Sequence, residues 1–398
     1  MIDVLVLLIR AFFGPKIGLC ATLAAAAAAS LALQARVVSA NPLAPESVKA
    51  AFLNPGKHGE VFWDMVTSTM QDAARQLNIE LEVIYAERNY RRMHALGLDI
   101  TRRAAPPQFL ILTNEDGAGT PVLEAADAAG IRTLLISSDV KSKDWERLGG
   151  PRDVLKNWIG TLIPDMETAG ARMARALLVA ARERKLYAAD GKLHLLVLDG
   201  DMWTPTANSR HQGLMRLIAA EPDVVVDRAI SAHWNAADAA DVTRKYLAWA
   251  KRAGVRVAGV WAANDPMALG AMTALRTAGL SPGKDVMIVG LNWSREGVEQ
   301  VDNGSMVLTD GGHFLMGTWS MIMLRDYLDG CDPFRTDVAN SLPTAAVTRE
   351  NAGRILTLLR KRLFARVNVA ALRAKFGDAC RPYDFSIEAY IRALGTVR

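Results

Sequence analysis

The segment from Arg256 to Asn292 constrains the fold of this chain more than any other part of it. The apolar run Val257–Trp261 predicts a buried strand, apolar residues at helical spacing follow it, and a second apolar run, Val286–Leu291, closes a β-α-β unit. Parallel strands joined by a helix end at the same edge of a sheet, and ligands of open α/β folds bind at that edge. Asn264 and Asn292 follow the two strands, so both are candidates for a ligand site.

The same positions also have structural explanations. Asp265 followed by Pro266 is typical of a helix start, where a side-chain oxygen caps the helix and proline takes the first helical position. This pattern predicts Asp265 as the cap. Asn292 and Trp293 are either ligand residues or loop residues that cover the sheet edge.

The unit resembles the second lobe of the type I periplasmic binding proteins, the ribose/galactose-binding family. The shared pattern is a strand, Asn-Asp, a small-residue helix, glycine, and a second strand that ends near an aspartate. The resemblance implies that Asn264 hydrogen-bonds the ligand, while Asn292 replaces the family's aspartate. Because an amide donates as well as accepts and carries no charge, the replacement argues against an ordinary pentose or hexose.

The resemblance covers nearly all of Val48–Leu328 and implies an α/β fold. We expect two doubly wound parallel-sheet lobes with three crossovers, which is the type I periplasmic binding protein fold. Residues 46–160 plus 313–330 are expected to form the N-terminal lobe, and 161–312 plus 331–398 the C-terminal lobe with an extended tail. A chain of 398 residues with 51% hydrophobic residues is long enough for two cores.

Two pairs in the N-terminal lobe match ligand positions of the family. Phe62 and Trp63 stand at the start of the first helix, where family members stack aromatic rings on the sugar; both could instead be core residues, and we favour Trp63 for the ligand. Ser137 and Ser138 replace an Asp-Arg pair that clamps hydroxyls. Hydrogen bonds to charged groups contribute about 1.5–3 kcal/mol against about 1 for neutral ones, so a different ligand or a weaker clamp is implied. Turn formation is the alternative explanation for both serines.

In the C-terminal lobe, Arg210 matches the arginine of an Arg-x-x-Gly helix that reaches into the family's cleft. Its fixed fork of donors suits vicinal hydroxyls or a carboxylate, although a lone helix arginine is more often a surface ion-pair partner. Asp310 is the nearest polar residue on the strand that returns to the first lobe. Of the loop residues Trp203 and Trp234 we include only Trp203. His313 is interpreted as structural, because no second histidine stands at metal-ligand spacing.

Residues 1–40 predict an export signal. Lys16 precedes a long Leu/Ala-rich run, and Val38-Ser39-Ala40 supplies the small residues of a cleavage point, so we expect a mature chain that starts near Asn41 in the periplasm. The alternative is an uncleaved membrane anchor, since Ile17–Leu33 is nearly long enough to span a bilayer.

Cys331 and Cys380 would remain after that cleavage. In an oxidising periplasm they are candidates for a disulfide, with two unpaired thiols as the alternative. The net charge of +5 is too mild to indicate nucleic acid as a partner. The basic, amphipathic tail beyond Gly330 is interpreted as a solvated outer face.

The function implied by the resemblance is binding rather than catalysis. We expect a monomeric solute-binding protein that captures a sugar-like ligand and delivers it to the membrane permease of an ABC importer. The alternative is a sensory receptor for an autoinducer-2-like ligand that signals through a membrane kinase or chemoreceptor. No G-x-S-x-G, H-E-x-x-H or phosphate-loop motif indicates an enzyme, and neither a cofactor nor a metal is expected.

Overall fold

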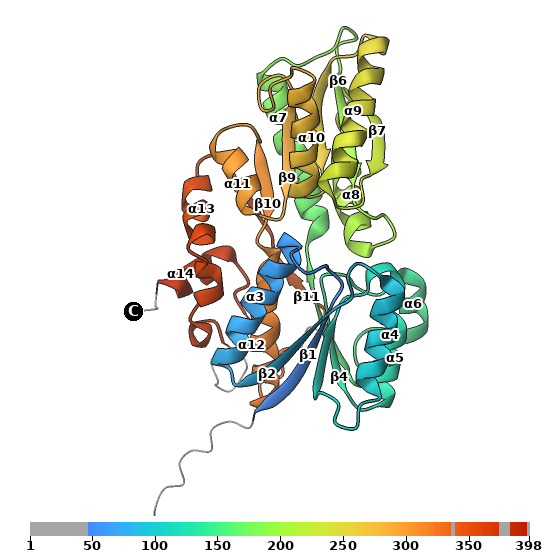
Figure 1. The fold of residues 1–398 in the computed structure, drawn as a ribbon, viewed down its shortest axis with the longest axis vertical. Helices are drawn as coiled ribbons and strands as arrows, with labels where there is room; N and C mark the ends of the chain where they lie inside the picture. The colour runs from blue at the N-terminus through green and yellow to red at the C-terminus, as the bar shows by residue number, and fades with distance from the viewer. Residues whose placement is uncertain (1–46, 336–338, 374–382, 396–398) are drawn as a thin grey trace, which may run out of the picture. The chain divides into compact units, whose positions relative to one another are not determined.

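The computed structural model describes residues 47–335, 339–373 and 383–395. The predicted export signal and Cys380 lie outside these ranges. Residues Ser47–Arg398 form one compact unit. It is built on two six-stranded sheets with interleaved helices, which confirms the predicted fold of two α/β lobes (Figure 1).

The N-terminal lobe contains an entirely parallel sheet in the order β11-β5-β4-β3-β1-β2. Helices α3 and α12 pack together on one face of this sheet, and α4 and α5 pack together on the other (Figure 1). The strands are β1 (Val48–Asn54), β2 (Ile79–Tyr85), β3 (Phe109–Leu112), β4 (Arg132–Ile136), β5 (Trp158–Pro164) and β11 (Ala339–Leu342). The helices are α3 (Val61–Gln76), α4 (Tyr90–Thr101), α5 (Gly119–Ala128), α6 (Ser142–Leu148) and α12 (Met316–Leu328).

The C-terminal lobe contains a sheet in the order β12-β10-β9-β8-β6-β7, in which only β12 is antiparallel. Helices α7 and α8 pack together, as do α9 and α10. The strands are β6 (Leu193–Asp199), β7 (Val224–Ser231), β8 (Val257–Ala262), β9 (Met287–Leu291), β10 (Leu308–Gly311) and β12 (Ala345–Val347). The helices are α7 (Met166–Glu183), α8 (Pro205–Ile218), α9 (Ala236–Ala253), α10 (Asp265–Thr277) and α11 (Arg295–Asp302).

The central strands of both sheets are completely buried. Every residue of β3, β8 and β9 is buried. This is expected of parallel strands covered by helices on both faces, and it explains why these strands stand out in the sequence as continuous apolar runs. Within the described ranges, no helix has the length and apolarity that a membrane crossing requires.

The tail beyond residue 331 is divided between the lobes, which differs from the boundary expected from the sequence. Strand β11 pairs with β5 in the N-terminal lobe, and after a short turn β12 pairs with β10 in the C-terminal lobe. Both strands cover a sheet edge that would otherwise expose unpaired backbone groups. Together with the passages from β5 to α7 and from β10 to α12, this makes three crossovers.

The helical part of the tail is divided in the same way. Helix α13 (Ala352–Arg360) packs on α11, whereas the short turn η3 (Leu363–Arg366) packs on α3. Helix α14 (Ile387–Leu394) buries Tyr390, whose hydroxyl lies 2.8 Å from that of Thr318 on α12. The tail therefore contacts both lobes.

Candidate ligand-binding site

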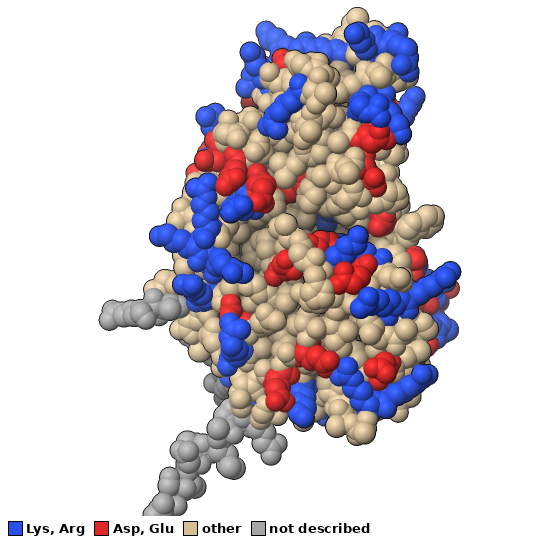
Figure 2. Space-filling view, in the orientation of Figure 1, with Lys and Arg blue, Asp and Glu red and all other residues tan. Residues whose placement is uncertain are grey.

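A hollow between the two sheets is lined by side chains from both lobes. It encloses about 50 Å³, which is room for a few water molecules, since each needs about 10–15 Å³. Side chains of both charges gather along the crease between the lobes (Figure 2). The lining residues are Glu60, Phe62, Trp63, Arg88, Glu115, Ser137, Thr204, Thr206, Arg210, Trp234, Asn264, Asn292 and His313. The carboxyl ends of the parallel strands thus meet at one place, as the fold requires.

Most of the residues singled out in the sequence lie around this hollow. Phe62, Trp63 and Ser137 line it from the N-terminal lobe, and Arg210, Asn264 and Asn292 line it from the C-terminal lobe. Trp63 is 2% exposed and packs edge-on against Phe62, with ring centroids 5.0 Å apart. It therefore belongs to the core as well as to the wall.

The other predicted residues do not line the hollow. Ser138 lies beside it, and its hydroxyl is 2.7 Å from that of Thr206. Trp203 is 70% exposed on the outside of the molecule. Trp293 is buried, and its indole nitrogen donates to the Ala345 carbonyl at 2.9 Å because β12 covers this side of the sheet.

Asp310 is fully buried and occupied by another partner. Its carboxylate accepts two hydrogen bonds from Arg172 on α7, at 2.5 and 2.9 Å. Arg172 also donates to the hydroxyl of Thr344, at 2.6 Å. This ion pair joins α7, β10 and the turn between β11 and β12, so Asp310 has a structural role at the crossovers in this conformation.

Arg210 is a buried cation without a carboxylate partner. Only 2% of it is exposed, its guanidinium donates to the Ala263 carbonyl and to the Met166 sulfur, and its Nε has no partner among the described residues. The guanidinium also lies over the Trp234 ring, 5.5 Å from the centroid. Burial lowers the pKa of Arg210 to about 10, because the charged form loses hydration that no anion replaces.

The nearest carboxylates are engaged elsewhere. Asp310 is paired with Arg172, as described above, and Asp199 accepts from His211 at 3.0 Å. The backbone of Arg210 is fixed by the close packing of α7 and α8, where a Cβ at Gly170 would collide with the Arg210 carbonyl oxygen. The fold therefore holds a fork of donors rigidly at the wall of the hollow.

The cap of α10 is Asn264 and not Asp265, which differs from the expectation. Asn264 is the cap, and its side-chain oxygen accepts from the Met267 amide at 2.9 Å. Asp265 instead accepts from the amide and hydroxyl of Ser294, both at 2.8 Å, and from the hydroxyl of Thr309 at 2.7 Å. Burial raises the pKa of Asp265 to about 6.

Asn264 still lines the hollow. Its amide nitrogen donates to the Trp234 carbonyl at 3.0 Å, so the side chain ties the start of α10 to the loop before α9. A ligand that bonds this amide has to share it with that loop.

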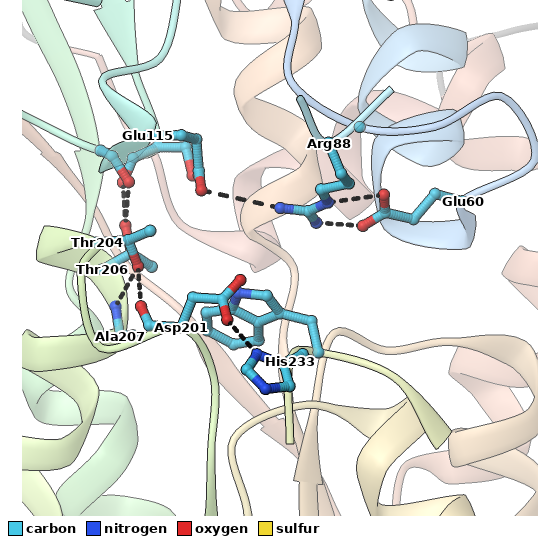
Figure 3. A network of polar contacts seen from close by, with 12 residues as sticks. Glu60, Arg88, Glu115, Asp201, Thr204, Thr206, Ala207 and His233 are labelled. Carbon is cyan, nitrogen blue, oxygen red and sulfur yellow. Dashed lines mark hydrogen bonds and ion pairs between the residues drawn. The ribbon is translucent and has the colours of Figure 1, made fainter. Parts of the chain in front are cut away.

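Three charged residues that the sequence analysis did not select line the N-terminal side of the hollow (Figure 3). Arg88 forms two hydrogen bonds with Glu60, one of them at 2.9 Å, and lies 3.8 Å from Glu115. Burial opposes the charge of Arg88, but the hydrogen bonds with Glu60 and the negative charges of Glu60 and Glu115 together outweigh it and raise the pKa of the guanidinium. Glu115 is 5% exposed, and burial raises its pKa.

Two further residues that the sequence analysis did not select for the ligand, Trp234 and His313, line the aromatic side of the hollow. The His313 ring stacks on Phe62 with centroids 4.5 Å apart, and its Nδ1 has no partner among the described residues. Burial, together with the nearby charge of Arg210, lowers the pKa of His313 well below its usual range. The imidazole is therefore neutral and can exchange a hydrogen bond with a ligand. Within the described residues, no group of histidine, cysteine and acidic side chains could hold a metal ion.

Several lining residues have a left-handed backbone although they are not glycine. The φ angles are 57° at Arg88, 68° at Ser137, 60° at Trp234 and 135° at Asn292. Such conformations cost about 1–3 kcal/mol each and cluster at functional sites. Their concentration around one hollow is the pattern expected of a binding site.

Two hydroxyl contacts join the lobes at the edge of the hollow (Figure 3). Thr206, in the first turn of α8, donates to the Ser137 carbonyl at 2.7 Å and shares a hydrogen bond with the Ser138 hydroxyl. The preceding Thr204 caps α8 by accepting from the Ala207 amide. The lobes are thus in contact on this side, which explains why the enclosed volume is small.

Comparison with known proteins gives consistent results. The model of the periplasmic binding protein domain matches residues 50–332. The xylitol-binding protein of Mycolicibacterium smegmatis is 24% identical over 83% of this chain and 84% of its own length. The ribose import binding protein RbsB of Escherichia coli is 26% identical over 68% of this chain and 81% of its own. A periplasmic sugar-binding protein from Pseudomonas fluorescens superposes with a TM-score of 0.77 at 29% identity, over 87% of this chain and all of the other.

Proposed function

Because this chain belongs to the periplasmic binding protein family, it binds substrates rather than converting them, and we propose that it captures a hydroxyl-rich small molecule between its lobes for an ABC importer. The family places it in the periplasm. The relatives named above are similar to most of the chain and are named for xylitol, ribose or sugar binding, so polyols and sugars are the first ligands to consider.

The observation that carries this proposal is the pair of opposed polar groups in one hollow. Arg210 on α8 presents hydrogen-bond donors that no carboxylate pairs with among the described residues. Glu115, after β3, presents a buried carboxylate that lies 3.8 Å from its ion-pair partner Arg88. A hydroxyl can donate to Glu115 and accept from Arg210, which an apolar or single-function ligand cannot do. A polyol that spans the hollow therefore supplies what both groups lack.

The remaining lining residues fit the same ligand class. Phe62 and Trp234 offer ring faces for C–H groups, while Ser137, Asn264 and Asn292 offer neutral hydrogen bonds. A ligand that contacts both lobes would bind the closed form more tightly than the open form, and this difference in affinity shifts the equilibrium toward the closed form.

Export and a disulfide complete the proposal. We propose that cleavage after Ala40 releases the chain into the periplasm and that Cys331, which is fully buried, pairs there with Cys380. In the chain-entropy model such a loop contributes about 4 kcal/mol. Mass spectrometry of the alkylated, unreduced secreted protein tests both points, and a Cys380 thiol that alkylates freely would refute the pairing.

A thermal-shift screen of the secreted protein tests the function. Xylitol, ribose, arabinose, galactose and autoinducer-2 would be compared at saturating concentration. Saturation at about a thousandfold above Kd contributes about 4 kcal/mol, or roughly 5 °C in Tm for a chain of this size. If none of these compounds raises Tm, the proposed ligand class is wrong.

Two variants of helix α8 locate the binding. Arg210→Met is expected to remove the shift, because it deletes the buried donors. Arg216→Met is the matched control, since Arg216 lies on the same helix with 74% of its side chain exposed and pairs with Glu167. Growth of a deletion strain on the identified ligand then separates import from sensing.

A further inference from the structure

A second and larger hollow lies just outside the first. It encloses about 480 Å³ and, like the inner hollow, is lined by both lobes. The N-terminal lobe contributes the segment that leads into α6, and the C-terminal lobe contributes the loop before α8 and the outer side of its first turns. The lining residues are Val140, Lys141, Ser142, Met202, Trp203, Pro205, Asn208, Ser209 and Gln212.

Trp203 is the outstanding member of this set. At 70% it is the most exposed large apolar side chain among the described residues. An indole left in water at the mouth of a cleft is costly, because its ring forfeits the burial that stabilises other tryptophans. The exposed face is free to receive a flat partner with an apolar surface.

The groups around Trp203 are mainly neutral hydrogen-bonding side chains. Within the described residues, the side chains of Ser209 and Gln212 form no hydrogen bond, so both can serve a ligand. The single cation, Lys141, is paired with Asp116 at 3.3 Å. A flat apolar face bordered by neutral amide and hydroxyl groups suits a sugar ring better than an anion or a peptide.

One turn of chain separates the two hollows. Thr204 and Thr206 line the inner hollow, whereas Trp203 and Pro205 line the outer one. The Thr206 hydroxyl, which lies 2.7 Å from that of Ser138, joins the two lobes at this turn. The inner hollow holds only a few waters, so a ligand with two rings can place just one of them inside.

We propose that the outer hollow is a second carbohydrate subsite, in which Trp203 supports a sugar ring linked to the ring held by Arg210. This rests on the proposed function and specifies its ligand as a disaccharide or glycoside. Since Val140–Ser142 and Trp203 belong to different lobes, the second ring also favours closure.

Calorimetry with matched pairs of free sugar and disaccharide tests the subsite. The pairs are arabinose with 1,5-arabinobiose, xylose with xylobiose, galactose with melibiose and glucose with maltose. At least one disaccharide is expected to bind about threefold to tenfold more tightly than its free sugar, which corresponds to one stacked ring. In Trp203→Ala this ratio is expected to fall toward one, and Trp203→Phe is expected to restore most of it.

The possible results distinguish the two proposals. Free sugars that bind while every disaccharide binds more weakly would overturn the outer subsite and leave the proposed function intact. A tighter disaccharide whose ratio is unchanged in Trp203→Ala would also overturn it. Absence of binding by both members of every pair, together with a negative thermal-shift screen, would overturn the proposed function and the subsite with it.

Discussion

Replacing Arg210 by methionine is expected to abolish ligand binding without destabilising the unliganded protein. The comparison is Arg172→Met, another long cation between the sheets. The two residues differ in one respect, because Arg172 is paired with the buried carboxylate of Asp310 whereas Arg210 has no anion. A buried arginine that has no anion beside it is expected where a ligand supplies the missing hydrogen-bond partner.

The magnitude follows from the burial of the charge. Burial lowers the pKa of Arg210 from 12.5 to about 10, and each unit corresponds to about 1.36 kcal/mol, so charging Arg210 costs the folded state about 3 kcal/mol. Because the folded pKa lies below the unfolded one, this cost is fully present at pH 7 and declines only as the pH rises through the folded pKa. Methionine removes the cost but leaves the Ala263 carbonyl without a donor, which costs about 1–3 kcal/mol.

The two effects nearly cancel in Arg210→Met, so its free energy of unfolding should lie within about 2 kcal/mol of the wild type. Arg172→Met leaves Asp310 buried and unpaired, which costs about 3–5 kcal/mol. Urea unfolding of the unliganded proteins at pH 7 measures both changes, and calorimetry measures ligand affinity. The reasoning is refuted if Arg210→Met loses as much stability as Arg172→Met, because Arg210 would then be a structural residue.

Further changes test the contacts between the lobes, a partly buried carboxyl group beside Ser138, and the packing of α7 on α8. Thr206→Val removes two contacts between the lobes, at about 1 kcal/mol each, and should therefore accelerate ligand dissociation about thirtyfold in stopped-flow fluorescence. An unchanged rate would show that these contacts persist in the open form. Burial raises the pKa of Asp139 to about 6, so its ionisation destabilises the folded state as the pH rises from about 4 to above 6. In Asp139→Asn, urea unfolding should show that this decline in stability is smaller by on the order of 2 kcal/mol. A pH profile identical to that of the wild type would contradict this. Gly170→Ala should lower Tm by several degrees, because its Cβ meets the Arg210 carbonyl oxygen, and a wild-type Tm would show that α7 and α8 can separate at little cost.

The fold was predictable because the central strands of its sheets are buried on both faces. The apolar runs Val257–Trp261 and Val286–Leu291 correspond to β8 and β9 in the structure. The tail was harder to assign, since β11 and β12 are short strands whose position depends on which sheet edge is open. That information lies in the edges of β5 and β10, far away in the chain.

The site was predictable only in part. Arg210 and Asn292 lie in the hollow because each follows a strand end or begins a helix at the ligand edge. Glu60, Arg88 and Glu115 were missed because isolated charged residues in loops are usually solvated, and nothing local indicates that three separate loops bring them together. The available signal was weak: Glu115 lies in the loop that follows β3, at the same edge.

The start of α10 shows where local patterns stop being sufficient. Asp-Pro is a good local reason to assign the cap to Asp265, yet Asn264 caps the helix. The difference arises because Ser294 and Thr309, from the segments after β9 and within β10, together offer three donors to the carboxylate of Asp265. An ionised carboxylate gains more from three donors than from one cap, since charge-assisted hydrogen bonds are about twice as strong as neutral ones. The neutral amide then takes the cap, so it is the neighbouring strands that decide which of the two adjacent polar residues caps the helix.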